Sequence, residues 1–206
     1  MEFTGISEAA FDFYEDLETD NSKVYWDSHK EIYQSAVRAP ILALTEALAG
    51  EFGSAKIFRP FRDVRFAKDK TPYKTRQGAF VATGQSTGYY FEVGAPGVRV
   101  AAGFYHSDPQ RLARIRKAID GPDGGTVLKL IAALEKAGWT LGGETLKTAP
   151  RGYERDNPRI ELLRHKAIVM NKSYGFAPFV SSSDLTEHVR KDWRAGRPLV
   201  EWFSQH

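Results

Sequence analysis

The residues best suited to chemistry in this 206-residue chain lie in one short basic segment. Residues 56–76 hold eight Lys and Arg side chains and two Asp side chains, so the local net charge is +6. Asp63 lies between Arg62 and Arg65, where a carboxylate can orient a guanidinium group whose planar fork matches phosphate and carboxylate ligands. The segment therefore predicts a site for an anion.

The pattern over residues 56–66 predicts a strand within this segment. Successive side chains of a strand point to opposite faces, and we expect the second of these two faces to be mostly buried. The first face carries Arg59, Phe61, Asp63 and Arg65, and the second carries Phe58, Arg62, Val64 and Phe66. A bulge at Pro60, which has no backbone N–H to donate, would shift this register and the position of Arg62.

A second basic loop is predicted between residues 142 and 157. It contains Lys147, Arg151, Tyr153 and Arg155, and loops often hold binding groups. The cationic side chain of Arg151 favours an anion site in this loop. Tyr153 favours the alternative interpretation, in which the loop is a structural turn and the Tyr153 ring packs against the protein.

A third part of the anion site is expected where Tyr105 and His106 end a predicted strand. The following residues, Ser107 to Gln110, are typical of a helix start, and a helix N-terminus attracts anions. The candidate ligand-binding residues are therefore Arg59, Arg62, Arg65, Lys70, Tyr73, Lys74, Tyr105, Arg151 and Tyr153. Their expected partner is a small phosphorylated or carboxylated molecule.

The sequence names no reaction, so it leaves open whether the protein is an enzyme. If the site is catalytic, Asp63 or His106 is the candidate base and Lys70 or Lys74 the candidate electrophile. The histidines lack the mutual spacing of metal ligands, so neither a metal nor another cofactor is expected.

Other functions compete with anion binding. Aromatic residues interleaved with the basic ones, namely Phe58, Phe61, Phe66 and Tyr73, also suit a nucleic-acid-binding protein. An interaction module without a ligand would use Tyr25, Trp26, Trp193 and Trp202 as exposed anchors, although their helical spacing favours the core. The oligomeric state is not predicted.

The charge distribution offers a structural alternative for the basic segment. Residues 1–54 hold 11 acidic and 3 basic side chains, a net charge of −8, whereas the whole chain has a net charge of +3. Acidic N-terminal helices packed across the basic segment would neutralise it without any ligand.

Several motifs resemble those of the DUF2461 family of uncharacterised proteins, nearly from end to end. They are Trp26-Asp27-Ser28-His29-Lys30 with Tyr33, Arg62-Asp63-Val64-Arg65-Phe66 followed by Asp69-Lys70-Thr71-Pro72-Tyr73-Lys74-Thr75, Gly103-Phe104-Tyr105, and residues 146–153 (LKTAPRGY). The resemblance implies one domain over residues 1–206 and no known activity.

Composition excludes several classes of protein. Without cysteine there is no disulfide, thiolate nucleophile or iron–sulfur cluster, which fits a reducing, cytoplasmic location. The acidic N-terminal residues do not form a secretory signal, and the most apolar window, residues 40–49, is too short to span a membrane.

The elements that must position these residues predict an α+β fold in a single domain, with a mostly antiparallel sheet flanked by N-terminal and C-terminal helices. Helices are expected from Ser7, from Asn21 or Ser22, and over residues 41–50, 107–120 and 126–137, with a short one after Asn157. A C-terminal helix that includes Trp193 is expected from Ser183 or Asp184, followed by a final turn at 199–203. Strands are expected over 56–66, 77–83, 89–94, 98–104 and 167–173.

Overall fold

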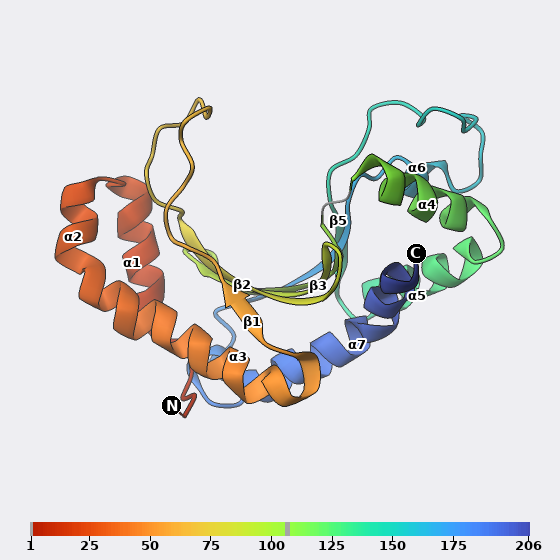
Figure 1. The fold of residues 1–206 in the computed structure, drawn as a ribbon. Coiled ribbons are helices and arrows are strands. Elements are labelled where there is room, and N and C mark those ends of the chain that lie inside the picture. The colour runs from red at the N-terminus through yellow and green to blue at the C-terminus, as the bar shows by residue number, and fades with distance from the viewer. Residues whose placement is uncertain (1, 106–107) are drawn as a thin grey trace. The chain divides into compact units, whose positions relative to one another are not determined.

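The computed structural model describes residues 2–105 and 108–206. Over these residues six strands form one antiparallel sheet, in the order β1-β2-β3-β4-β6-β5, and helices come from both ends of the chain (Figure 1). The predicted α+β class is confirmed. The strands are β1 (Ala55–Ile57), β2 (Arg76–Gly84), β3 (Thr87–Gly94), β4 (Gly97–Phe104), β5 (Thr140–Gly142) and β6 (Ile168–Gly175). The helices are α1 (Glu8–Thr19), α2 (Lys23–Ile32), a π-helical turn η1 (Tyr33–Arg38), α3 (Ala39–Phe52), α4 (Pro109–Asp120), α5 (Gly124–Lys136), α6 (Ile160–Leu163), a 3-10 turn η2 (Pro178–Ser181) and α7 (Leu185–Gln205).

The chain divides into two compact units, each built from three separate segments. Unit 1 comprises residues 1–81, 90–100 and 173–191, and unit 2 comprises residues 82–89, 101–172 and 192–206. The boundaries fall inside strands and inside α7 rather than in a linker. One domain over residues 1–206 stays a prediction, and each unit is described by itself.

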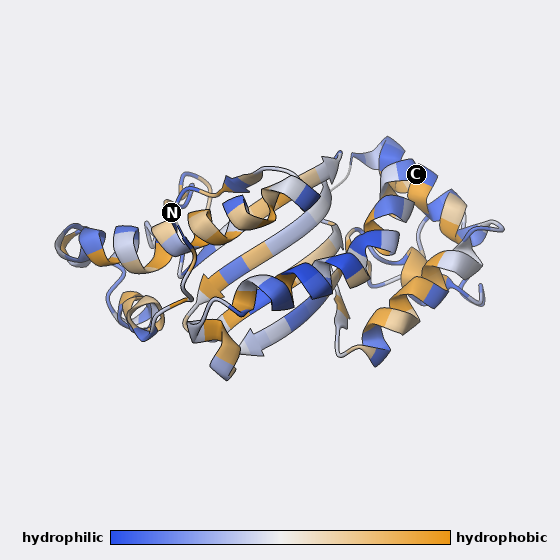
Figure 2. Cartoon of the chain, turned by 90° about the horizontal axis from the view of Figure 1, so that it is seen from below, coloured by the Kyte–Doolittle hydropathy of each residue, from blue (hydrophilic) through white to orange (hydrophobic). Residues whose placement is uncertain are grey.

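An aromatic core holds the N-terminal helices of unit 1 together. Phe13 on α1 packs edge-on against Tyr14 and against Trp26 of α2, with ring centroids 5.1 and 5.9 Å away. Tyr33 packs on Trp26 at 4.8 Å, and all four rings are buried. Burial of such large rings is a main source of stability. Along the helices, apolar residues (orange) alternate with hydrophilic ones (blue), the pattern of helices that bury one side (Figure 2).

Unit 2 contains the predicted helices that follow β4. The Asp108 carboxylate accepts hydrogen bonds from the backbone N–H groups of Gln110 and Arg111, both at 2.9 Å, and so caps α4. Ile115 and Ile119 of α4 are buried, and Leu112 is half-buried. Within α7, Trp193 is fully buried and its ring stacks on Tyr89 at 5.3 Å.

The predicted strand over residues 56–66 is wrong in extent. Strand β1 ends at Ile57, and residues 58–66 lie in a loop. Pro60, which has no N–H to donate to a ladder, lies shortly after the end of β1. The expected burial of the Phe66 face is also wrong, because the Phe66 side chain is 97% exposed. Side chains alternate between two faces only within a continuous strand, and the strand does not continue past Ile57.

Three other boundaries differ from expectation. Helix α3 continues past Gly50 to Phe52 and stops at Gly53, whose positive φ of 97° suits glycine. The predicted loop after residue 141 begins inside the short strand β5, which pairs with β6. The C-terminal helix and the expected final turn form one helix, α7, with Pro198 in its interior.

Candidate functional site

The basic loop, defined as residues 58–75 between β1 and β2, is fastened to the start of α2 in unit 1. The Asn21 side chain donates to the carbonyl oxygen of Tyr73 at 3.1 Å and accepts from the N–H of Tyr73 at 3.0 Å. The Tyr73 ring is buried and stacks on Trp26 with centroids 4.3 Å apart and planes 7° apart. Figure 1 shows the loop leaving the sheet beside α1 and α2. Tyr73 therefore serves as an anchor of the loop.

The two arms of the basic loop run antiparallel near its base. Phe61 and Tyr73 form an isolated bridge, and the Lys74 N–H donates to the Pro60 carbonyl at 2.8 Å. This short ladder holds Lys74 and Arg59, the residue before Pro60, near one another at the base. The rest of the loop extends beyond the ladder and ends in the exposed Phe66.

Two arginines of the loop are paired with carboxylates of the same loop. Asp63 accepts hydrogen bonds from Arg65, at 2.9 Å from Nε and at 2.7 Å from a terminal nitrogen, and these bonds lower the pKa of Asp63. Asp69 accepts bonds from the backbone N–H and hydroxyl of Thr71, which are the main cause of its lowered pKa, and also pairs with Arg62. The pairs are solvent-exposed, so they order the loop more than they stabilise the fold.

The acidic N-terminal helices do not neutralise the basic segment through ion pairs. Within the part of the chain that the structure describes, the ion pairs of residues 56–76 join Arg62 to Asp69, Arg65 to Asp63 and Arg76 to Glu92. None of these carboxylates belongs to residues 2–54. The segment therefore keeps most of its positive charge.

Arg59 and Lys74 form no ion pair with any described residue. The Lys74 ammonium lies over the ring of Phe58, with Nζ 5.5 Å from the centroid. Burial, and next the nearby charge of Arg59, lower the pKa of Lys74. Two neighbouring cations repel one another, and although the Asp63 charge also acts on Arg59, no carboxylate of the described residues lies at ion-pair distance from either cation. An anion between them relieves the repulsion.

A second charged cluster, on strands β3 and β4 of unit 1, adjoins Phe58. The Phe58 ring lies 6.2 Å from the ring of Tyr90, and the Arg99 guanidinium lies 5.7 Å from the same Tyr90 ring. The Tyr90 hydroxyl donates to Glu92 at 2.6 Å, and Arg99 donates to Glu92 at 3.0 and 3.2 Å. Burial, followed by the Glu92 charge, raises the pKa of Tyr90. This network fixes Arg99 in place.

A cavity of about 290 Å³ in unit 1 begins where the basic loop ends. Its polar lining consists of Glu18, Thr75, Arg76, Glu92, Arg99 and Ser173. The guanidinium of Arg76 is only loosely held, 3.7 Å from Glu92, and is mostly exposed. Sequence reasoning missed Glu92 and Arg99, and their only signal is a pair of opposite charges inside two otherwise apolar strands.

The remaining sequence candidates belong to unit 2. Tyr105 is half exposed at the end of β4, and Arg151 is exposed beside Gly152, whose φ is 89°. Tyr153 is half-buried; burial and the nearby Asp120 raise its pKa, as expected for a ring that packs. His106 lies outside the described residues.

A basic cavity of about 290 Å³ lies in this same part of unit 2. It is lined by Lys147, Thr148, Ala149, Arg155, Glu161 and Arg164, with Ile160. Arg164 pairs with Glu161 at 3.2 Å, whereas Lys147 and Arg155 form no ion pair with the described residues. Arg151 does not line this cavity.

The described residues contain no group of three or more His, Asp or Glu side chains that could hold a metal ion. In the same residues, no helix is both long enough and apolar enough to cross a bilayer.

Comparison with known proteins assigns a family. The model of the conserved hypothetical protein family DUF2461 matches residues 9–202. The chain belongs to the DUF2461 family. The match covers both units, so the basic loop and the basic cavity of unit 2 lie inside the region typical of DUF2461 proteins. A comparison with curated proteins finds no match.

Proposed function

We propose that this DUF2461 protein binds a small phosphorylated or carboxylated molecule at the base of the basic loop in unit 1. The observation that carries the proposal is the pair Arg59 and Lys74, two neighbouring cations that form no ion pair with any described carboxylate. Arg62 and Arg65, by contrast, already have partners. An anionic group between Arg59 and Lys74 gains charge-assisted hydrogen bonds at a site that is already ordered.

The other candidate residues support this site in different ways. Asp63 orients Arg65, Lys70 donates to the carbonyl of Val64 at 2.9 Å, and Tyr73 anchors the loop. The neighbouring cavity that contains Arg76 offers room for the body of the ligand.

The proposal concerns binding and assigns no reaction. Asp63, Lys70 and His106 stay candidates for catalysis. Tyr105, Arg151 and Tyr153 stay candidate ligand-binding residues of unit 2. A cytoplasmic location also stays a prediction.

Thermal unfolding in the presence of sugar phosphates, nucleoside monophosphates and dicarboxylates tests the proposal. A ligand at one hundred times its dissociation constant stabilises the fold by about 2.7 kcal/mol, or about 5–11 °C for a chain of this length. The double variant Arg59→Gln, Lys74→Gln should lose this shift. The control, Lys56→Gln with Lys68→Gln, removes the same charge outside the pair and should keep it. Equal shifts in both variants would refute the site.

Nucleic-acid binding is the second candidate function, and one observation favours it. Phe66 is 97% exposed and Phe61 48% exposed, and both lie among cations of the basic loop, as in proteins that stack bases on aromatic rings. This function requires binding to single-stranded RNA or DNA that weakens steeply with salt and weakens further in Phe66→Ala. Binding of small anions that is unaffected by Phe66→Ala would favour the first proposal instead.

The interaction module without a ligand loses three of its four expected anchors. Trp26, Trp193 and Trp202 are buried, with exposed fractions of 6% or less, whereas Tyr25 is half-buried. Buried rings stabilise the fold and are not available to a partner.

A further inference from the structure

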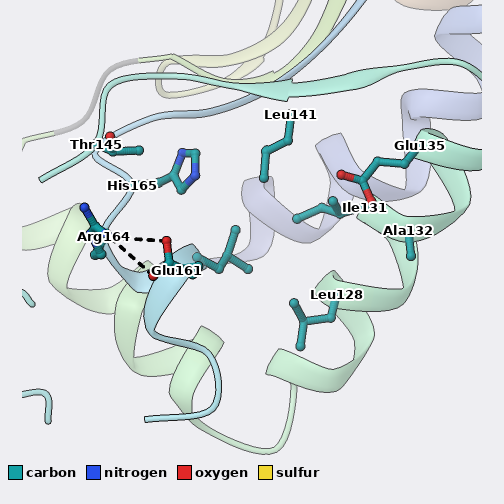
Figure 3. A pocket seen from close by; sticks show the side chains of 10 residues that line it. Leu128, Ile131, Ala132, Glu135, Leu141, Thr145, Glu161, Arg164 and His165 are labelled. Carbon is teal, nitrogen blue, oxygen red and sulfur yellow. Dashed lines mark hydrogen bonds and ion pairs between the residues drawn. The ribbon is translucent and has the colours of Figure 1, made fainter. Parts of the chain in front are cut away.

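Unit 2 contains a cavity of about 490 Å³ that the proposed anion site does not use. It lies between α5, β5 and α6, and Figure 3 shows side chains from these elements pointing into a common space. Its apolar lining consists of Leu128, Ile131, Ala132, Leu141 and Leu162. A cavity of this volume with a mostly apolar wall is typical of sites for small organic molecules.

One charged pair on the wall is already satisfied. Arg164 donates to both carboxylate oxygens of Glu161 at 3.2 Å, to the carbonyl of Leu146 at 2.8 Å and to the carbonyl of Lys147 at 3.2 Å. The dashed lines in Figure 3 mark the Arg164–Glu161 contacts. The charges of this pair cancel, so Arg164 adds no net positive charge to the wall.

The polar groups that remain on the wall include two hydrogen-bond acceptors. His165 Nδ1 lies 3.0 Å from the carbonyl of Ala167, and a carbonyl can only accept, so Nδ1 carries the proton and Nε2 of the neutral ring is an acceptor. Glu135 lines the same cavity, and its carboxylate forms no hydrogen bond or ion pair with the described residues. The wall thus has one uncompensated negative charge, that of Glu135, beside an apolar surface.

We propose that this cavity binds a small amphipathic amine. The apolar body of the amine fills the space between Leu128, Ile131 and Leu141, and its ammonium group pairs with Glu135, which lies across the cavity from His165 (Figure 3). Charge complementarity favours a cation over a carboxylate, because no described cation that lines the cavity is free.

NMR titration of the ¹⁵N-labelled full chain with three phenyl compounds tests the proposal. Phenethylamine, 2-phenylethanol and 3-phenylpropionate share an apolar body and differ in their polar group. We expect saturable amide shifts in α5 and at residues 164–166, with the amine bound most tightly and the carboxylate most weakly. Glu135→Gln should weaken phenethylamine about threefold to tenfold and leave 2-phenylethanol unchanged, since only the amine uses the charge.

Two alanines of α5 offer a matched pair of blocking variants. Ala132 lines the cavity and Ala133 does not, yet both are exposed on the same helix, so either should accept phenylalanine without loss of fold. Ala132→Phe should abolish the shifts, and Ala133→Phe should keep them. The proposal is overturned if no probe gives saturable shifts, if 3-phenylpropionate binds as tightly as phenethylamine, or if both variants bind alike.

Discussion

Replacement of Asn21 by alanine should loosen the basic loop from α2. The variant removes both reciprocal hydrogen bonds between the Asn21 amide and the Tyr73 backbone, at 3.0 and 3.1 Å. At about 0.5–1.5 kcal/mol each, the two bonds together contribute about 1–3 kcal/mol. For a chain of this length the melting temperature should fall by about 2–12 °C. The Tyr73 amide, left without its acceptor, should exchange with solvent faster than in the parent protein.

Ser22→Ala is the matched control for this experiment. The Ser22 hydroxyl accepts from the Tyr25 N–H at 3.1 Å and caps α2, so its loss also costs about 0.5–2 kcal/mol. Ser22 has no contact of this kind with the basic loop. If hydrogen exchange at Tyr73 and the affinity for small anions change equally in both variants, then Asn21 does not position the loop and the reasoning fails.

Three further predictions concern stability. Phe66→Ala should change the free energy of unfolding by less than about 0.5 kcal/mol in urea titrations, since the ring is 97% exposed; a larger loss would place Phe66 in the core. Burial raises the pKa of Tyr33 to about 12, so its neutral form is favoured in the fold. Its contribution to stability is complete below pH 10 and should fall by up to about 3 kcal/mol as the pH rises through 12, a loss that Tyr33→Phe should remove from the unfolding profile. In thermal unfolding, Gly97→Ala should cost more than about 1 kcal/mol, because φ is 100° and an added Cβ would lie 2.3 Å from the Gly175 carbonyl oxygen. In the same assay, Gly50→Ala, at an exposed position of helix α3, should stabilise by about 0.5–1 kcal/mol.

Helices and hairpins were predictable because their signals are local. The helix start at Asp108 and the three strands β2, β3 and β4 follow from capping chemistry, alternation and short turns. The basic loop was not predictable in the same way. Its anchor joins Asn21 to Tyr73, 52 residues apart, and nothing in the local pattern shows that contact.

The candidate site was predictable in part. The sequence identified the basic segment and the pairing of Asp63 with an arginine, because residues two apart can meet in a turn. The sequence did not show that Arg62 and Arg65 have carboxylate partners while Arg59 and Lys74 have none among the described residues at ion-pair distance, because the path of the loop decides which charges meet. It also missed the Glu92–Arg99 cluster, which only the alignment of neighbouring strands brings together.

The most direct test of the central claim is a phosphate titration of the ¹⁵N-labelled full chain at constant ionic strength, so that screening does not change. Binding between Arg59 and Lys74 predicts saturable shifts of the amides at residues 58–62 and 73–76. These shifts should disappear in the Arg59→Gln, Lys74→Gln double variant and persist in the Lys56→Gln, Lys68→Gln control. Shifts that do not saturate, or that survive in the first variant, would contradict an anion site at the base of the basic loop.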